Sequence, residues 1–148
     1  MKVKPNLGMP QYSGRYGDLV FCYNRILGVT YTRRNTYPTL TENNFKMGSI
    51  TKNLFAIQPS SGFKQDASLY LLRYNSLPQN ARQYINNWSQ LYLKLMHKMA
   101  HEDPTLDLRT ITREYIYEHD LPCISIRKAV EAGLLPKVLD WQTYDHQI

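Results

Sequence analysis

The longest regular pattern of apolar and polar residues in the chain runs from Asn80 to Met99. Apolar residues recur there at intervals typical of the 3.6-residue period of a helix that buries one face. They are Ala81, Tyr84, Ile85, Trp88, Leu91, Tyr92, Leu95, Met96 and Met99. The pattern predicts one long helix over 80–99 on which the other elements pack. It predicts fold and indicates nothing about function.

A second helical pattern runs from about Glu42 to Ile57. Its apolar face consists of Phe45, Ile50, Leu54 and Ile57. Two threonines can cap its start: Thr39, which has Glu42 three residues later as in a capping box, and Thr41.

Shorter helices are predicted along the rest of the chain. Asp66 can cap one that ends near Leu77, and another spans Thr110–Glu118. Ser125 can cap a last helix, Ile126–Ala132, which ends at Gly133. The side chains expected to anchor the tail are Val138, Leu139 and Trp141.

Before these helices, Asp18–Arg34 has the pattern of a β-hairpin. Two runs of strand-forming residues, Leu19–Tyr23 and Val29–Arg33, flank a connection that ends at Gly28. Glycine is suited to a backbone position with positive φ. An isolated hairpin is marginally stable in water, so we expect this one to pack on the helical body or on the sheet of another chain.

Residues 1–17 contain several prolines and glycines and have no helical or strand period. They predict an extended basic arm, followed by a single domain over 18–148 with the hairpin at 18–34 and a helical body at 39–148. The fold class expected is therefore α+β: an extended N-terminal arm and β-hairpin followed by a small helical bundle.

Charge distinguishes the two parts of the chain. The net charge is +6, yet residues 1–65 carry nine basic and two acidic residues, whereas residues 66–148 carry nine basic and ten acidic ones. A positive N-terminal part suits an acidic partner, either nucleic acid or an acidic protein surface, although a solvated basic face has the same composition. No apolar run is long enough to cross a membrane, which predicts a soluble protein without a membrane partner.

No motif predicts catalysis. His97 and His101 lie four residues apart on one helical face, but zinc requires three or four ligands and the glutamate of a zinc-protease helix is missing. Cys22 and Cys123 have apolar neighbours and predict buried free thiols. We therefore expect no enzyme activity, no catalytic residue, no cofactor and no metal; a metal-dependent hydrolase at the two histidines is the weakest alternative.

Partner binding is better supported. Basic and aromatic residues alternate on the predicted hairpin and just before it, as in surfaces that grip phosphates and stack on bases. We expect contacts from Arg15, Tyr16, Arg25, Tyr31, Arg33 and Arg34. The same arginines can bind acidic side chains of a neighbouring subunit.

Residues 12–55 carry a resemblance. The stretches Tyr12–Phe21, Thr30–Arg34 and Pro38–Thr41 together resemble small tailed-phage and prophage structural proteins that begin with a Ser-Gly-x-x-Gly β-hairpin. The connection between the strands is longer here and lacks the Gly-Lys of those proteins. The helical part has no counterpart in them. The resemblance implies a virion or virion-assembly component without catalytic residues.

We therefore expect a non-enzymatic structural or assembly protein of a virion, such as a phage head, neck or tail component, assembled in the host cytoplasm. Its arm and hairpin would bind other subunits of the same assembly. The alternative is a nucleic-acid-binding protein that uses the same basic and aromatic face within a ribonucleoprotein.

Overall fold

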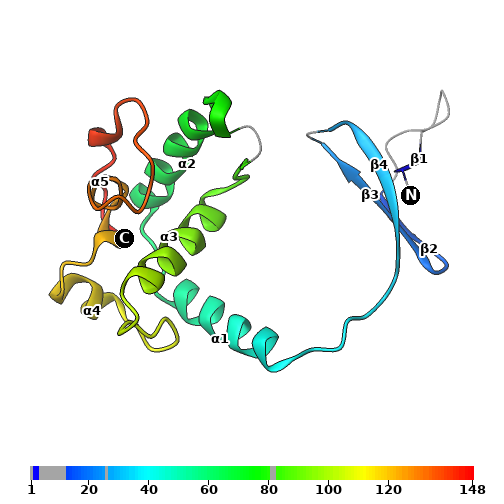
Figure 1. Cartoon of the computed structure of the whole chain (residues 1–148), viewed down its shortest axis with the longest axis horizontal. Coiled ribbons are helices and arrows are strands. Elements are labelled where there is room, and N and C mark those ends of the chain that lie inside the picture. The colour runs from blue at the N-terminus through cyan, green and yellow to red at the C-terminus, as the bar shows by residue number, and fades with distance from the viewer. Residues whose placement is uncertain (1, 4–12, 26, 81–82) are drawn as a thin grey trace. The chain divides into compact units, whose positions relative to one another are not determined.

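The computed structural model describes residues 2–3, 13–25, 27–80 and 83–148. The chain divides into two compact units, Met1–Leu40 and Thr41–Ile148. The division falls between Leu40 and Thr41, whereas the sequence predicted one after Gly17. The first unit is a β-sheet and the second is helical, which confirms the α+β class (Figure 1).

The sheet is antiparallel, with strand order β1-β4-β3-β2. Its strands are β1 (Lys2–Val3), β2 (Gly14–Tyr16), β3 (Leu19–Asn24) and β4 (Val29–Arg34). β3 and β4 form the predicted hairpin. Gly28, in their connection, has the expected positive φ of 60°.

The N-terminal arm was predicted to reach Gly17, but Gly14–Tyr16 belongs to the sheet. β2 pairs with β3 across a tight turn at Gly17 and Asp18, where Gly17 has a φ of 57° that favours glycine. The sequence pattern missed this strand because three residues are too few to show a two-residue period. Residues 1 and 4–12 of the predicted arm lie outside the described residues.

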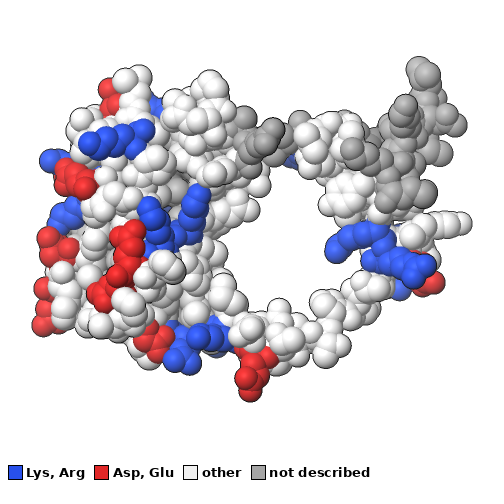
Figure 2. All heavy atoms as spheres, viewed as in Figure 1, with Lys and Arg blue, Asp and Glu red and all other residues white. Residues whose placement is uncertain are grey.

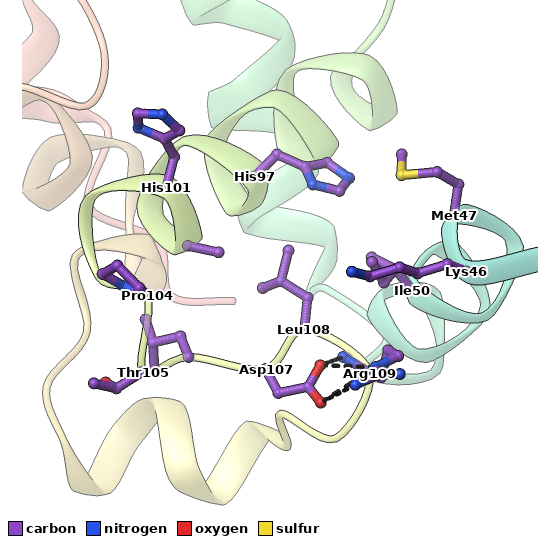
Figure 3. A pocket seen from close by; sticks show the side chains of 12 residues that line it. Lys46, Met47, Ile50, His97, His101, Pro104, Thr105, Asp107, Leu108 and Arg109 are labelled. Atoms are coloured by element: carbon purple, nitrogen blue, oxygen red, sulfur yellow. Dashed lines mark hydrogen bonds and ion pairs between the residues drawn. The ribbon is translucent and has the colours of Figure 1, made fainter. Parts of the chain in front are cut away.

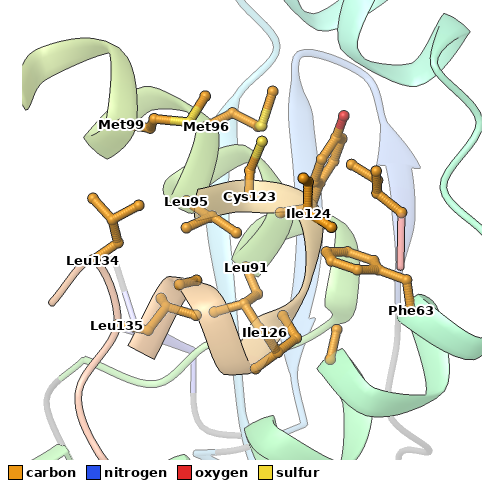
Figure 4. Packing of buried hydrophobic residues seen from close by; sticks show 14 of the residues in the cluster. Phe63, Leu91, Leu95, Met96, Met99, Cys123, Ile124, Ile126, Leu134 and Leu135 are labelled. Carbon is orange, nitrogen blue, oxygen red and sulfur yellow. The ribbon is translucent and has the colours of Figure 1, made fainter. Parts of the chain in front are cut away.

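The described residues of the helical unit form five α-helices and three 3₁₀ turns. They are α1 (Glu42–Ala56), α2 (Ser61–Ser76), η1 (Pro78–Asn80), α3 (Trp88–Glu102), α4 (Arg113–Glu118), η2 (Pro122–Ile124), α5 (Ile126–Glu131) and η3 (Trp141–Thr143). One apolar cluster joins all five helices and the tail. Figure 4 shows Leu91, Leu95 and Met96 of α3 packed beside Cys123 and Ile126. None of the helices in the described part of the chain is long and apolar enough to cross a membrane.

The predicted helix over 80–99 is correct from Trp88 onward and wrong over 83–87, whereas Ala81 lies outside the described residues. α3 begins at Trp88, and Asn87 caps it by accepting a hydrogen bond from the Gln90 N–H at 2.9 Å. Its apolar stripe is buried as expected, from Leu91 to Met99. Ile85 is also buried, but in irregular backbone.

One predicted helix start needs correction, and for another the structure has one of the two caps that the sequence offered. α2 begins at Ser61, capped by the hydroxyl of Ser60, and Asp66 lies buried in its interior rather than at its start. α1 is capped at Thr41, whose backbone N–H and hydroxyl both donate to the Asn44 side chain, at 2.9 and 2.6 Å. Glu42 is not the partner in this cap.

The Ser125 cap is confirmed: its hydroxyl accepts from the Lys128 N–H at 3.2 Å. α5 is slightly shorter than predicted, and α4 begins at Arg113 rather than Thr110. Apolar residues expected to be buried are exposed at Phe45, Tyr84 and Leu139. Val138 is buried as expected and Trp141 packs against the core, and two residues that the pattern missed, Tyr144 and Ile148, also hold the tail.

Candidate interaction surface

The six residues expected to share one face of the hairpin are divided by the strand register. Arg15, Val20 and Arg33 are paired in one row, and Tyr16, Leu19 and Arg34 are paired in the next. Neighbouring rows point to opposite sides of a sheet because successive side chains alternate.

We call these two sides the Arg15 face and the Arg34 face. The Arg15 face carries Arg15, Val20, Cys22, Tyr31 and Arg33; the Arg34 face carries Tyr16, Leu19, Phe21, Tyr23, Thr30, Thr32 and Arg34. Arg25, the sixth predicted residue, lies in the turn after β3. The prediction of a single basic and aromatic face is therefore wrong.

On the Arg15 face, Val20 is paired with an arginine on each flanking strand. Arg15 and Arg33 are its partners on the two flanking strands, so their Cα atoms are about 10 Å apart at ordinary strand spacing. Tyr31, two residues before Arg33 on β4, is 41% exposed. This face thus combines two positive charges, a half-buried valine and an accessible aromatic ring.

On the Arg34 face, the row Tyr16–Leu19–Arg34 is exposed. Phe21 and Tyr23 continue this face along β3 and are half-buried. Thr30, 8% exposed, is the one buried side chain among the described residues of the sheet unit. No apolar side chain described in this unit reaches the burial of a core residue.

The arginines differ in how firmly the chain holds them. Arg15 donates from Nε to the Gly17 carbonyl at 3.2 Å. With the Asn35 amide turned so that its oxygen faces Arg15, that oxygen accepts two further hydrogen bonds at 3.2 Å. None of the ion pairs within the described residues involves Arg25, Arg33 or Arg34. Basic side chains gather on the sheet unit, whereas acidic and basic ones are mixed over the helical unit (Figure 2).

The two histidines of the metal hypothesis border a hollow of about 550 Å³ in the helical unit (Figure 3). His97 and His101 lie on α3, Lys46 on α1, and Asp107 and Arg109 on the loop that follows α3. Figure 3 shows the two imidazole rings pointing in different directions. Within the described ranges, no group of three or more His, Cys, Asp or Glu residues is placed to hold a metal ion.

The carboxylate of this hollow is already engaged. Arg109 donates to Asp107 from Nε at 3.1 Å and from Nη2 at 2.9 Å, and this bonding lowers the pKa of Asp107. Lys46 adds a smaller effect in the same direction. The hollow therefore has a neutralised acid, one further ammonium group and two histidines around an apolar floor that includes Ile50 and Leu108.

The cysteines differ in burial. Cys123 is fully buried, and burial raises the pKa of its thiol to about 12. Cys22 is half-buried on the Arg15 face. The prediction of a buried thiol is therefore confirmed for Cys123 and wrong for Cys22.

Sequence reasoning missed the apolar part of this surface. Leu19 and Val20 were predicted only as strand residues, and they lie in the two rows that hold the arginines. The signal that could have revealed them is the parity of positions on paired strands, once the turn at Gly17 and Asp18 fixes the register. Comparison of the chain with protein-family models, curated proteins and solved structures finds no match.

Proposed function

We propose that this protein is a non-enzymatic structural or assembly component of a virion, which binds neighbouring subunits through its N-terminal sheet. The observation that carries the proposal is the burial pattern of this sheet. Val20, Cys22 and Val29 on one side and Phe21 and Tyr23 on the other are only half-buried. A small sheet gains independent stability when an apolar face is covered. Association with another subunit would provide that cover.

Charge favours an acidic surface on the neighbouring subunit. The guanidinium groups of Arg25, Arg33 and Arg34 form no ion pair with any residue that the structure describes. Arginine suits this role because its planar group binds carboxylates in a bidentate manner and is weakly hydrated. Assignment to a virion, and to a phage head, neck or tail, is supported by the resemblance of residues 12–55.

Self-association of the full chain tests this proposal. Size-exclusion chromatography with light scattering is expected to show oligomers or higher assemblies. Leu19→Asp, on the Arg34 face, and Val20→Asp, on the Arg15 face, identify which side is used, because a carboxylate in either row neutralises the arginines paired with it and repels an acidic partner surface. Leu139→Asp places the same charge on an exposed site of the helical unit and serves as the control. A strict monomer at high concentration would contradict self-assembly.

Nucleic-acid binding is a second candidate, favoured by one observation. Arg15, Tyr31 and Arg33 share a face. One nucleic-acid strand can therefore contact the two arginines through its phosphates and stack a base on the Tyr31 ring. Affinity for single-stranded DNA or RNA should then fall steeply with salt. It should be weakened more by Arg33→Ala than by Arg34→Ala, whose side chain lies on the opposite face. Equal effects of the two variants would count against this candidate.

A further inference from the structure

Helix α1 presents an exposed stripe that the fold of its own unit does not use. Its members follow the 3-4 spacing of positions that share one helix face, and each is exposed. They are Glu42, Phe45, Ser49, Lys52 and Ala56. The buried residues of α1, Ile50 and Leu54, point in a different direction. The largest side chain of the stripe, Phe45, is 65% exposed.

The order of residues in this stripe is self-complementary. An antiparallel pair of α1 helices, with a two-fold axis level with Met47, would bring Glu42 beside Lys52 of the second copy. It would also bring Phe45 beside Ser49 of the second copy. Each charge then meets its opposite, and each large ring meets a small side chain, as close packing of two helices requires.

Two details of α1 favour such a close approach. The Ser49 hydroxyl donates to the Lys46 carbonyl at 2.8 Å, so it needs no further partner when a ring covers it. Gly48 lies beside the stripe, and a Cβ at this position would meet no described atom within 4 Å. Packing within the described chain therefore does not require glycine there, whereas a second helix backbone can come closer to glycine than to any other residue.

We propose that α1 is a two-fold symmetric interface through which two copies of this chain associate in antiparallel fashion. The surface belongs to the helical unit, so the proposal stands apart from binding through the N-terminal sheet. A helix pair of this length buries less area than a standard stable interface. The association is therefore weak in solution, and further contacts within an assembly would strengthen it by raising the effective concentration.

A charge exchange tests the pairing directly in the full chain. Sedimentation velocity from about 10 μM to about 1 mM covers the affinities of weak interfaces. Glu42→Lys and Lys52→Glu are each expected to weaken the dimer about ten-fold or more, because two opposite-charge pairs become like-charge pairs. Glu118→Lys, an equal charge change on exposed α4, should leave the dimer unchanged. Phe45→Ala should also weaken it, whereas Leu72→Ala, at an exposed position of α2, should not.

Mixing the two charge variants gives the sharpest result. Glu42→Lys leaves lysine at both ends of the stripe and Lys52→Glu leaves glutamate at both ends. The mixture should therefore form a heterodimer with an affinity within about three-fold of the wild-type dimer. A favourable interaction of Glu42 with the helix dipole alone would not produce this recovery.

Three results would overturn the proposal: no self-association of the wild type in this range, single variants that associate like the wild type, or no heterodimer on mixing. Self-association that is lost in Leu19→Asp or Val20→Asp but unaffected by the charge exchange would overturn this interface and leave the sheet proposal standing. The reverse pattern would retain α1 as the interface and contradict the sheet.

Discussion

The side-chain amide of Asn75 exchanges two hydrogen bonds with the backbone of Ile85. Its Nδ2 donates to the Ile85 carbonyl at 2.8 Å, and its Oδ1 accepts from the Ile85 N–H at 3.1 Å. Ile85 is buried, so its backbone groups need partners within the protein. A helix would supply those partners locally, whereas Asn75 supplies them from α2. This pair stabilises irregular backbone before Trp88, where α3 begins.

Replacing Asn75 with alanine is expected to lower the free energy of unfolding by about 1–3 kcal/mol, because two buried backbone groups lose their partners. Urea denaturation with an unchanged m-value would measure the loss. Ser76→Ala, at the exposed neighbouring position, should change stability by less than about 0.5 kcal/mol. Equal effects of the two substitutions would show that the Asn75 pair contributes little.

Gly62 and His146 are predicted to be coupled. A Cβ at Gly62 would lie 2.6 Å from Cδ2 of His146, whose Nδ1 is 3.0 Å from the buried Asp66 carboxylate. Gly62→Ala should destabilise the protein because the ring must turn away from Asp66. In a His146→Ala background the ring atoms are gone and only the Cβ contact at 3.0 Å remains, so the same substitution should cost less.

Thermal or urea denaturation of the parent protein, the two single variants and the double variant gives the coupling free energy between positions 62 and 146. We expect it to be about 1–2 kcal/mol. The Asp66 carboxylate keeps its second hydrogen bond, from the backbone N–H of residue 146 at 3.0 Å, in every variant. An identical effect of Gly62→Ala in the two backgrounds would contradict the coupling.

The two thiols should differ in reactivity. With its pKa raised to about 12, the Cys123 thiol has only about one thiolate in ten thousand molecules at pH 8, and the thiolate is the reactive form. A maleimide should label the half-buried Cys22 first. In a Cys22→Ser variant, labelling of Cys123 should then be as slow as unfolding; rapid stoichiometric labelling of that variant in native buffer would show that Cys123 is accessible.

The same thiol makes stability depend on pH in the alkaline range. Its folded pKa lies above the unfolded value, so the stability it contributes is fully present below about pH 9 and is lost as the pH rises toward 12. A Cys123→Ala variant should show a shallower loss of unfolding free energy over this range than the parent protein. Parallel pH profiles for the two proteins would contradict this assignment.

Substitutions on the two faces of the sheet should have independent effects on the free energy of association with a partner. Arg15 and Arg33 flank Val20 on one face, so Arg15→Ala and Arg33→Ala should be non-additive in the free energy of association, by about 0.5 kcal/mol or more. Arg33→Ala and Arg34→Ala, on opposite faces, should be additive. Coupling of Arg33 to Arg34 but not to Arg15 would contradict the register.

Local sequence signals predicted much of the fold. The hairpin of β3 and β4, the positive φ of Gly28 and the Ser125 cap follow from interactions between residues a few positions apart. The errors have a different origin. Asp66 has the residue type of a helix cap, yet it lies inside α2 because the tail returns to it from 80 residues away through His146.

The candidate surface was also predicted only in part from the sequence. Composition identified the basic and aromatic residues, since charge and residue type are properties of the sequence itself. Which of them share a face depended on strand pairing: one turn at Gly17 and Asp18 placed Arg15 beside Val20 and sent Arg34 to the opposite side.

By itself, the sequence determined where helices and strands can form, because periodicity, caps and turn residues act over a few neighbouring positions. The tertiary structure decided where α3 begins, which apolar residues are buried and which face each arginine occupies. Those outcomes depend on contacts between distant segments, such as the Ile148 N–H donating to the Ile124 carbonyl at 2.9 Å. A buried backbone group must find a partner somewhere in the fold, and local pattern does not specify which one.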